Sequence, residues 1–351
     1  MKERYEVLDG LRGTAALMVA IFHVLEMTWL DPAENPLHHA YLAVDFFFAL
    51  SGFVVGHAYD DRRANGMTIG QFFAVRLKRL HPLVILGVII GLVGYVADPF
   101  VGKDQQVSIG RLMLTFLPLL LTLPSPGLPN RYGETHSLNG PVWTLFQEYL
   151  ANVVYALIGR WIGIKALAAL VVVAAVALTA TAAHHGFLGA GWGWDTVWIA
   201  PVRMLFPFLA GLLVYRLKVR VRIPAAWPLL SLALIAVFAA PFLSIKGTIK
   251  PNGLLEAAMI ILLFPPILAM GAAGSVGGVT AKVCRFFGDL SYPLYITHYP
   301  FIYIYGHWVW NSKPDRATAL GVGAVLIVFL LALAWVAMRF WDAPIRKRLG
   351  R

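Results

Sequence analysis

Charged residues and cysteine are both scarce in this sequence of 351 residues. Asp, Glu, Lys and Arg make up 13% of the chain, whereas a soluble domain carries about 25%. The one cysteine, Cys284, excludes disulfides within the chain and metal sites made of several thiolates. No His-x-x-x-His or Glu-x-x-His pattern occurs, so we expect no dedicated metal site.

The sequence instead consists largely of long hydrophobic runs. Hydrophobic residues make up 59% of the positions and the mean hydropathy is +0.71. These values predict an all-α polytopic membrane protein embedded in a lipid bilayer. The net charge of +11 does not indicate a nucleic-acid partner, because the basic residues cluster at the ends of the apolar runs. We therefore expect no nucleic acid among the partners.

Ten apolar segments have about the length needed to cross a membrane, and an eleventh, residues 109–123, is shorter. No internal repeat or low-complexity tract divides the chain, so we expect one integral membrane domain over residues 1–351 without an appended soluble domain. The first apolar stretch lacks a small-residue cleavage site and is expected to remain as a signal anchor. The ten expected spans are residues 11–28, 41–58, 80–97, 141–160, 165–183, 196–216, 226–244, 254–272, 290–310 and 317–340.

The basic residues give the expected orientation, because Lys and Arg accumulate in cytoplasmic loops. If the four basic clusters are all cytoplasmic, an even number of crossings must link the termini. Residues 109–123 are then a partial or re-entrant helix that walls a cavity. The expected fold is ten transmembrane helices plus this short helix, with both termini cytoplasmic. The clusters lie within residues 2–4, 62–79, 216–222 and 346–351.

The first apolar segment carries two ionisable residues on one helical face. Arg12 and His23 are eleven residues apart, which is close to three helical turns and about 16 Å along the axis. An arginine near a helix end can instead be an interfacial anchor, and a lone intramembrane histidine can be a packed helix contact. Because an ionisable group at mid-depth is costly, His23 is a candidate for chemistry.

Two further expected spans carry carboxylates. Asp45 lies in the second span, where it needs a cation or hydrogen-bond donors. Ser51, followed by a glycine in the same span, is a candidate for chemistry or for close helix packing. Glu148 lies about a turn and a half inside the fourth span, after Trp143 at the expected membrane interface. For Glu148, a structural ion pair is the alternative to a role in catalysis.

The polar stretch 67–81 precedes the third span. It holds Arg76 and Arg79, which are i,i+3 neighbours and share a face if the stretch is helical. One interpretation is a solvated cytoplasmic surface. The other is a phosphate-binding element, because guanidinium groups bind phosphate in a bidentate manner.

A polar stripe crosses the ninth expected span. Ser291, Tyr295 and His298 are spaced i, i+4, i+7 on an otherwise apolar helix. His298 is a second deep histidine, and the sequence leaves open which of His23 and His298 carries the chemistry. Four other histidines fall in expected outer loops, where we expect them to be solvated: His38, His39, His184 and His185.

In this order, these segments resemble the membrane acyltransferase 3 family. The resemblance covers essentially the whole chain, with two departures: Thr144 replaces a serine and Asp342 replaces a glutamate. The matching segments are Leu8–Gly13 with His23 (an Arg-x10-His signature), Val44–Phe53, Arg76–Pro82 (Arg-x-x-Arg), Trp143–Glu148 (Trp-Ser-Leu-x-x-Glu), Ser291–His298 and Asp342–Pro344 (Glu-x-Pro).

The resemblance implies an acyltransferase that O-acylates hydroxylated acceptors. The donor is a cytoplasmic acyl-CoA, expected to be acetyl-CoA, which acts as a co-substrate; no permanently bound cofactor is expected. Arg12, with Arg76 and Arg79, is expected to bind the phosphates of the donor. His23 is the expected general base or transient acyl carrier.

A third group is expected to orient the imidazole, as in a triad, and the candidates are Glu148, Asp45 and His298. Ser51 and Ser291 are the candidates for stabilising the oxyanion. The full set of supporting candidates is Ser51, Trp143, Ser291 and Tyr295.

The acceptor is expected to be a saccharide or a glycolipid, and the sequence leaves open which one and on which side of the membrane it is modified. The expected location is the bacterial inner membrane, and the oligomeric state is open, a homodimer included. The alternative function is a transporter or flippase for a glycan or lipid, but no duplicated hydropathy pattern supports it. Five tryptophans could stack on sugar rings or serve as interfacial anchors: Trp192, Trp194, Trp198, Trp308 and Trp310.

Overall fold

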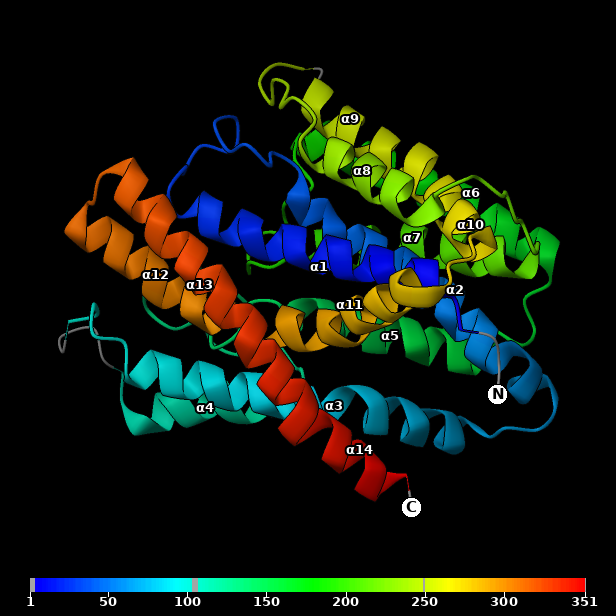
Figure 1. The fold of residues 1–351 in the computed structure, drawn as a ribbon, viewed down its shortest axis with the longest axis horizontal. Coiled ribbons are helices and arrows are strands. Elements are labelled where there is room, and N and C mark those ends of the chain that lie inside the picture. The colour runs from blue at the N-terminus through cyan, green and yellow to red at the C-terminus, as the bar shows by residue number, and fades with distance from the viewer. Residues whose placement is uncertain (1–3, 103–106, 249, 351) are drawn as a thin grey trace.

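The computed structural model describes residues 4–102, 107–248 and 250–350. Over these ranges the chain is helical, and its one extended pairing is an isolated bridge between Glu134 and Gly193. The predicted all-α fold is confirmed for this part of the chain. Figure 1 shows most helices aligned roughly with the long axis of the molecule, and the start of α1 and the end of α14 both lie in the right half of the view.

Some helices are joined by a few residues and others by longer loops, and two of the longer helical stretches contain a π-helical turn. In chain order they are α1 (Glu6–Glu26), η1 (Ala40–Leu42), α2 (Ala43–Ala64), α3 (Ile69–Val96), α4 (Ile109–Leu120), α5 (Val142–Ile158), α6 (Ile164–His185), α7 (Ile199–Arg216), α8 (Ala226–Phe238), α9 (Pro251–Ala258), η3 (Met259–Leu263), α10 (Phe264–Ala273), α11 (Gly278–Thr297), α12 (Tyr299–Ser312), α13 (Arg316–Val336), η4 (Ala337–Asp342) and α14 (Ala343–Leu349). The π-helical turns are η3 and η4.

Seven helical stretches in the described ranges are long and apolar enough to cross a membrane. Three of the ten expected spans are not among them. α5 has 17 residues, α8 has 13, and the expected span 290–310 is divided between α11 and α12. The helices support an integral membrane protein, while the count of ten crossings and the cytoplasmic termini stay predictions. The seven stretches are residues 6–26, 40–64, 69–96, 164–185, 199–216, 251–273 and 316–349.

The third helix begins earlier than expected. α3 starts at Ile69 rather than near residue 80, so the polar stretch and the apolar span form one helix of 28 residues. The start is fixed by a capping box: the Thr68 hydroxyl accepts from the Gln71 N–H, and the Gln71 side chain accepts from the Thr68 N–H. As a result, Arg76 and Arg79 lie one turn apart on the same helix.

The segment expected to be a partial helix forms the 12-residue helix α4, which lies beside α3 (Figure 1). The chain from Leu121 to Pro141 then folds into the protein without regular structure. Its buried polar groups bond to one another: the Ser125 N–H donates to the Thr135 carbonyl at 2.9 Å, and His136 Nε2 lies 3.0 Å from the Thr122 carbonyl. Irregular backbone at this depth requires such internal partners.

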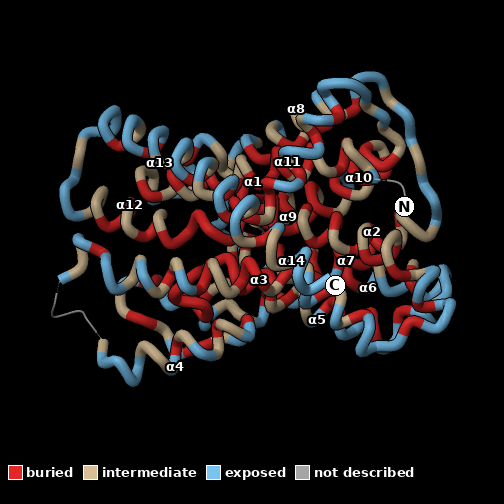
Figure 2. Tube along the Cα trace, turned by 60° about the horizontal axis from the view of Figure 1, so that its bottom comes forward, coloured by how far each residue is buried: buried red, intermediate tan, exposed pale blue. Residues whose placement is uncertain are grey.

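α1, α2 and α7 form the centre of the molecule. In their spanning windows 67%, 78% and 67% of the residues are buried, against 22% for α6 and for the α13–α14 stretch. Figure 2 shows the same contrast, with buried residues concentrated inside and exposed residues along the outer helices. The outer helices expose rows of Val, Leu and Phe, as expected for a surface that faces lipid.

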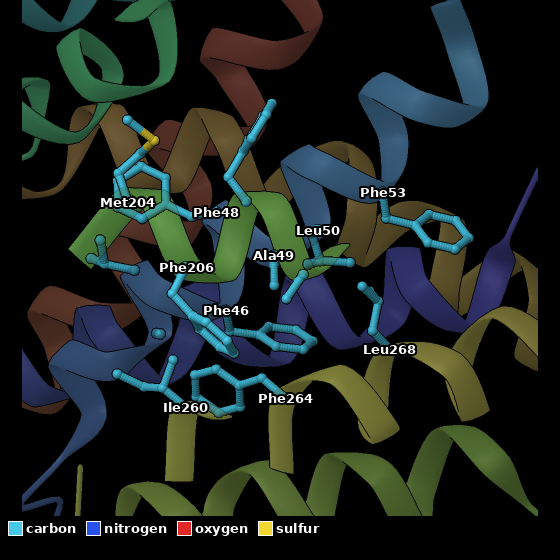
Figure 3. Packing of buried hydrophobic residues seen from close by; sticks show 14 of the residues in the cluster. Phe46, Phe48, Ala49, Leu50, Phe53, Met204, Phe206, Ile260, Phe264 and Leu268 are labelled. Carbon is cyan, nitrogen blue, oxygen red and sulfur yellow. The ribbon is translucent and has the colours of Figure 1, made fainter. Parts of the chain in front are cut away.

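Close backbone approach joins α2 to α7. A Cβ atom on Gly52 would lie 1.9 Å from the Phe208 carbonyl oxygen, and one on Gly211 would lie 2.0 Å from the Ala49 carbonyl oxygen. The packing interpretation of the Ser-Gly pair is therefore correct for the glycine. On the neighbouring side, α2 packs against α10 through Phe46 and Phe264, whose ring centroids are 5.5 Å apart (Figure 3).

Candidate active site

Two cavities lie along α1, and each borders a different half of that helix. The first, which we call the Arg12 cavity, has a volume of about 400 Å³ and is bordered by the first half of α1. The second, the His23 cavity, has a volume of about 330 Å³ and is bordered by the second half. Val44 and Tyr295 border both cavities, so the two spaces approach each other at these side chains.

Arg12 points into the protein, and its guanidinium group is held by three partners. Its Nη2 donates to Asp9 Oδ1 at 2.9 Å and to the Gly288 carbonyl at 2.8 Å, and its Nε donates to Ser291 Oγ at 3.0 Å. The side chain is 26% exposed and borders the Arg12 cavity. This position favours a ligand-facing cation over an interfacial anchor.

Arg76 and Arg79 border the same cavity from α3. Arg76 forms an ion pair with Glu148, whose carboxylate also accepts a hydrogen bond from Ser51 Oγ at 2.9 Å. Arg79 borders the cavity as well, so three guanidinium groups share one space. A cluster of this kind is stabilised by bound anions.

Glu148 and Asp45 do not contact His23, which corrects the expectation that one of them orients its ring. Glu148 borders the Arg12 cavity, where it neutralises Arg76. Asp45 is fully buried, and its Oδ2 lies 2.5 Å from Arg203 Nη2. Both carboxylates therefore form structural ion pairs with arginines from other helices.

The carboxylate that contacts His23 is Glu26, one turn further along α1. His23 Nδ1 lies 2.6 Å from Glu26 Oε1, and both side chains border the His23 cavity. An Nδ1–H that donates to Glu26 leaves the lone pair of Nε2 available as a base. Glu26 was not among the residues predicted from the sequence, although the His-x-x-Glu spacing places the two residues on one face of a helix.

His298 lies next to His23, with ring centroids 5.4 Å apart, but it borders neither cavity. Its Nδ1 lies 2.8 Å from the Tyr295 carbonyl and 3.1 Å from that of Leu294, so Nδ1 must carry the hydrogen. Its Nε2 is buried without a hydrogen-bond partner in the described part of the chain. The structure thus distinguishes the two histidines: His23 reaches a cavity and His298 does not.

The other two members of the polar stripe, Ser291 and Tyr295, contact different partners. Ser291 donates to the Gly288 carbonyl at 2.7 Å and accepts from Arg12, so it is occupied at the Arg12 cavity. Because the Thr144 hydroxyl donates to a carbonyl, the Tyr295 hydroxyl must donate to Thr144 Oγ1, 3.0 Å away. Neither Ser291 nor Ser51 borders the His23 cavity, which argues against both as donors to an oxyanion formed beside His23.

Glu134 is a further buried carboxylate that the sequence analysis did not find. It lies in the loop before α5, borders the His23 cavity, and accepts hydrogen bonds from the Tyr303 and Tyr299 hydroxyls. Burial raises the pKa of Glu134 to about 8, although the tyrosine hydrogen bonds and the charge of Arg131 act in the opposite direction. The Tyr299 ring lies 4.8 Å from that of His23, so this loop forms part of the same wall.

One of the histidines expected to be solvated is fully buried. His39 lies before η1, and its Nδ1 is 3.2 Å from Glu256 Oε1 on α9. Glu256 also accepts from the Tyr41 hydroxyl at 2.5 Å and from Asn252 at 2.6 Å. Tyr41 borders the His23 cavity, so this network fixes one of its walls.

The family comparison agrees with the arrangement of motifs around the two cavities. Residues 5–339 match the profile of a family described as an acyltransferase domain, and the chain belongs to this acyltransferase 3 family. The family therefore supports acyl transfer as the activity of this membrane protein. The chain is 35% identical over 196 residues to the Rhizobium radiobacter protein named "Protein 2 in picA locus", a match that covers 52% of this chain and 96% of that protein. No solved structure matches this chain.

Proposed function

We propose that this protein is an O-acyltransferase that moves an acyl group, expected to be acetyl, from cytoplasmic acyl-CoA to a hydroxyl of a saccharide or glycolipid acceptor. One observation carries the proposal. Two cavities meet at Val44 and Tyr295, with Arg12 bordering one and His23 the other. A donor in the first cavity and an acceptor in the second would meet beside His23.

The Arg12 cavity suits the phosphates of the donor. Arg12, Arg76 and Arg79 converge on it, and guanidinium groups bind phosphate oxygens in a bidentate manner. Arg12 and Arg76 are each paired with a carboxylate, so phosphate would compete with these carboxylates for the same N–H donors. From Arg12 the extended pantetheine arm would follow α1 toward His23, about 16 Å away along the axis.

The His23 cavity suits a hydroxylated ring. Aromatic side chains can pack on the apolar face of a sugar, while carboxylates accept hydrogen bonds from its hydroxyls. Glu26 and Glu134 supply the carboxylates. Of the five tryptophans considered from the sequence, Trp192 and Trp310 border this cavity. Two further tryptophans also border it, Trp29 and Trp143.

In the proposed mechanism, His23 is the general base. Its Nε2 takes the proton of the acceptor hydroxyl as the oxygen attacks the thioester carbonyl, and Glu26 stabilises the imidazolium that forms. The tetrahedral intermediate then collapses with cleavage of the carbon–sulfur bond. The leaving thiolate of CoA takes the proton from Nε2, so the products are the O-acyl acceptor and CoA with a free thiol.

The expected setting is the bacterial inner membrane with both termini in the cytoplasm, where acyl-CoA is made. The Arg12 cavity includes the start of α1 and Arg346 of α14 in its wall, so it would open to the cytoplasm in this orientation. The acceptor would then reach His23 from the opposite side.

The test is acyl transfer by purified protein with radiolabelled acetyl-CoA, followed into glycan and lipid extracts. We expect His23→Ala to abolish transfer while donor binding is kept. Arg12→Ala should weaken donor binding, because it removes a charge-assisted contact worth about 1.5–3 kcal/mol, or about 10- to 150-fold in Kd. Lys78→Ala is the matched control, since Lys78 is exposed on the same helix as Arg76 and borders neither cavity.

Three outcomes would contradict the proposal. Near-normal turnover by His23→Ala would exclude His23 as the base. Unchanged donor affinity in Arg12→Ala would mean that Arg12 does not bind the donor. Failure of the wild-type protein to bind acetyl-CoA at any concentration would exclude it as the donor.

A further inference from the structure

An aromatic cluster lies at the mouth of the Arg12 cavity. Its rings belong to Tyr5, Phe53, His57 and Tyr215, and we call it the rim cluster. The Tyr5 ring lies 5.2 Å from that of Phe53 and 5.0 Å from that of His57, both edge to face. The cavity wall here includes Arg4 and Arg346, whose side chains are 43% and 46% exposed, so this is where the cavity opens to solvent.

The cluster has an inner and an outer layer. Tyr5 and His57 border the cavity and are half-buried, whereas Phe53 and Tyr215 pack behind them and do not border it. Arg220 also supports Tyr5 from outside the cavity: its Nη2 donates to the Tyr5 hydroxyl at 3.2 Å and its guanidinium lies 5.5 Å from the ring centroid. The two cavity-facing rings are therefore held in place before any ligand binds.

Along α1 the chemical groups occur in a fixed order. Tyr5 lies at the mouth, Arg12 about 10 Å further in, and His23 about 16 Å beyond Arg12. Along α2 the order is the same, from His57 at the mouth to Val44 at the junction of the two cavities. The cavity thus offers aromatic rings, then guanidinium groups, then a mainly apolar passage that ends at an imidazole.

An acyl-CoA has its parts in the same order: a purine ring, phosphates, a flexible arm and a thioester. We propose that Tyr5 and His57 form the subsite for the adenine ring of the donor, an inference that rests on the proposed use of acyl-CoA. Aromatic side chains stack on purine faces, and each such contact contributes a factor of about 5 to 150 to the affinity, equivalent to about 1–3 kcal/mol. Arg220, beside Tyr5, adds a cation–π contact to the ring that stacks.

The test compares two donors that share the thioester and differ in the nucleotide. Acetyl-CoA carries the adenosine 3′,5′-bisphosphate portion, and S-acetyl-4′-phosphopantetheine lacks it. We expect Tyr5→Ala and His57→Ala each to raise the Kd for acetyl-CoA by about tenfold and to leave the Kd for S-acetyl-4′-phosphopantetheine unchanged. Adenosine 3′,5′-bisphosphate alone should compete with acetyl-CoA, and the same variants should weaken that competition by the same factor.

The matched control is Trp161→Leu, which removes an aromatic ring that is 72% exposed and borders neither cavity. It should leave both dissociation constants unchanged. If Tyr5→Ala fails to fold, Tyr5→Leu keeps the apolar contact with Phe53 but removes the stacking face, and the same result is expected.

The outcomes separate this inference from the proposed function. If the wild-type protein binds both donors equally well, or if the variants weaken both donors by the same factor, the adenine subsite is excluded while acyl-CoA use stands. If the wild-type protein binds neither donor, the proposed function fails and the inference fails with it. A loss confined to acetyl-CoA and to adenosine 3′,5′-bisphosphate supports the subsite.

Discussion

Replacement of Glu26 by glutamine tests the proposed mechanism at its least expected residue. Glu26 Oε1 lies 2.6 Å from His23 Nδ1, a distance typical of a charge-assisted hydrogen bond. Glutamine has the same shape but no charge, so it should bind the neutral ring and stabilise the imidazolium less. A hydrogen bond to a charged group contributes about 1.5–3 kcal/mol, so kcat should fall about 10- to 150-fold.

A larger fall in kcat would indicate that the tautomer of His23 has changed. If the glutamine amide donates to Nδ1, the hydrogen of the imidazole moves to Nε2 and the base is lost. In either case the Kd for acetyl-CoA should not change, because Glu26 borders the His23 cavity and not the Arg12 cavity.

The assay measures kcat for label transfer and, separately, donor affinity by titration calorimetry. Glu34→Gln is the control, since Glu34 is an exposed carboxylate in the loop after α1 that borders neither cavity. Full kcat in Glu26→Gln would refute the reasoning, because the contact would then contribute nothing to the transition state. An equal fall in kcat in Glu34→Gln would show that kcat depends on the negative charge of this region in general.

Three further predictions concern stability in detergent. Asp45→Asn leaves Arg203 buried without its counter-charge and should cost about 3–5 kcal/mol in unfolding free energy, and thermal unfolding would measure it; an intact fold with no turnover would instead give Asp45 a role in catalysis. Gly52→Ala should lower the Tm, because the new Cβ would lie 1.9 Å from the Phe208 carbonyl oxygen; an unchanged Tm would show that α2 and α7 can separate without loss. The pKa of Glu134 is about 8 in the folded protein, against an ordinary value of 4.5. Protonation of Glu134 should therefore stabilise the folded state increasingly as pH falls from about 8 to about 4.5. Glu134→Gln should remove this part of the pH dependence of Tm, and an identical pH dependence in both proteins would contradict the assignment.

Short-range periodicity predicted which of the candidate residues share a helix. Arg12 and His23 lie on one helix, so their shared face follows from 3.6 residues per turn. Arg76 and Arg79 lie on one helix for the same reason. Glu26 was open to the same reasoning, because it is three residues from His23, but the orienting carboxylates predicted from the sequence lie on other helices.

The partners of the buried carboxylates could not be found in this way. Asp45 and Arg203 are 158 residues apart, and Arg76 and Glu148 are 72 residues apart. Which helices lie side by side depends on close contacts such as that of Gly52 with α7, and no local pattern encodes them. Each carboxylate looked available for chemistry because its arginine lies on a helix that the sequence does not place beside it.

The prediction of helix boundaries from the sequence was limited for a related reason. Hydropathy identifies where a chain can be apolar, but a helix can extend beyond its apolar part. α3 begins at Ile69 because of the Thr68–Gln71 capping box, although its first three turns mix basic and polar residues with apolar ones. The expected span 290–310 breaks at His298, just before Pro300, which has no N–H for the Ile296 carbonyl; the Asn139 side chain donates to that carbonyl instead. Both features depend on side-chain contacts with the backbone rather than on hydropathy.

In the proposed mechanism the acyl group crosses the boundary between the two cavities, so neither large substrate has to pass through the membrane. Val44 and Tyr295 border both spaces, and the Phe47 and Tyr295 rings meet edge to face at 5.5 Å. Only the acyl group and the end of the pantetheine arm need to pass this point, because the nucleotide would stay among the arginines and the acceptor on the far side. A smaller residue at Phe47, such as Phe47→Ala, should therefore admit longer acyl chains, and a comparison of acetyl-CoA with octanoyl-CoA would measure the change. An unchanged preference between these two donors would show that the acyl chain does not pass between Phe47 and Tyr295.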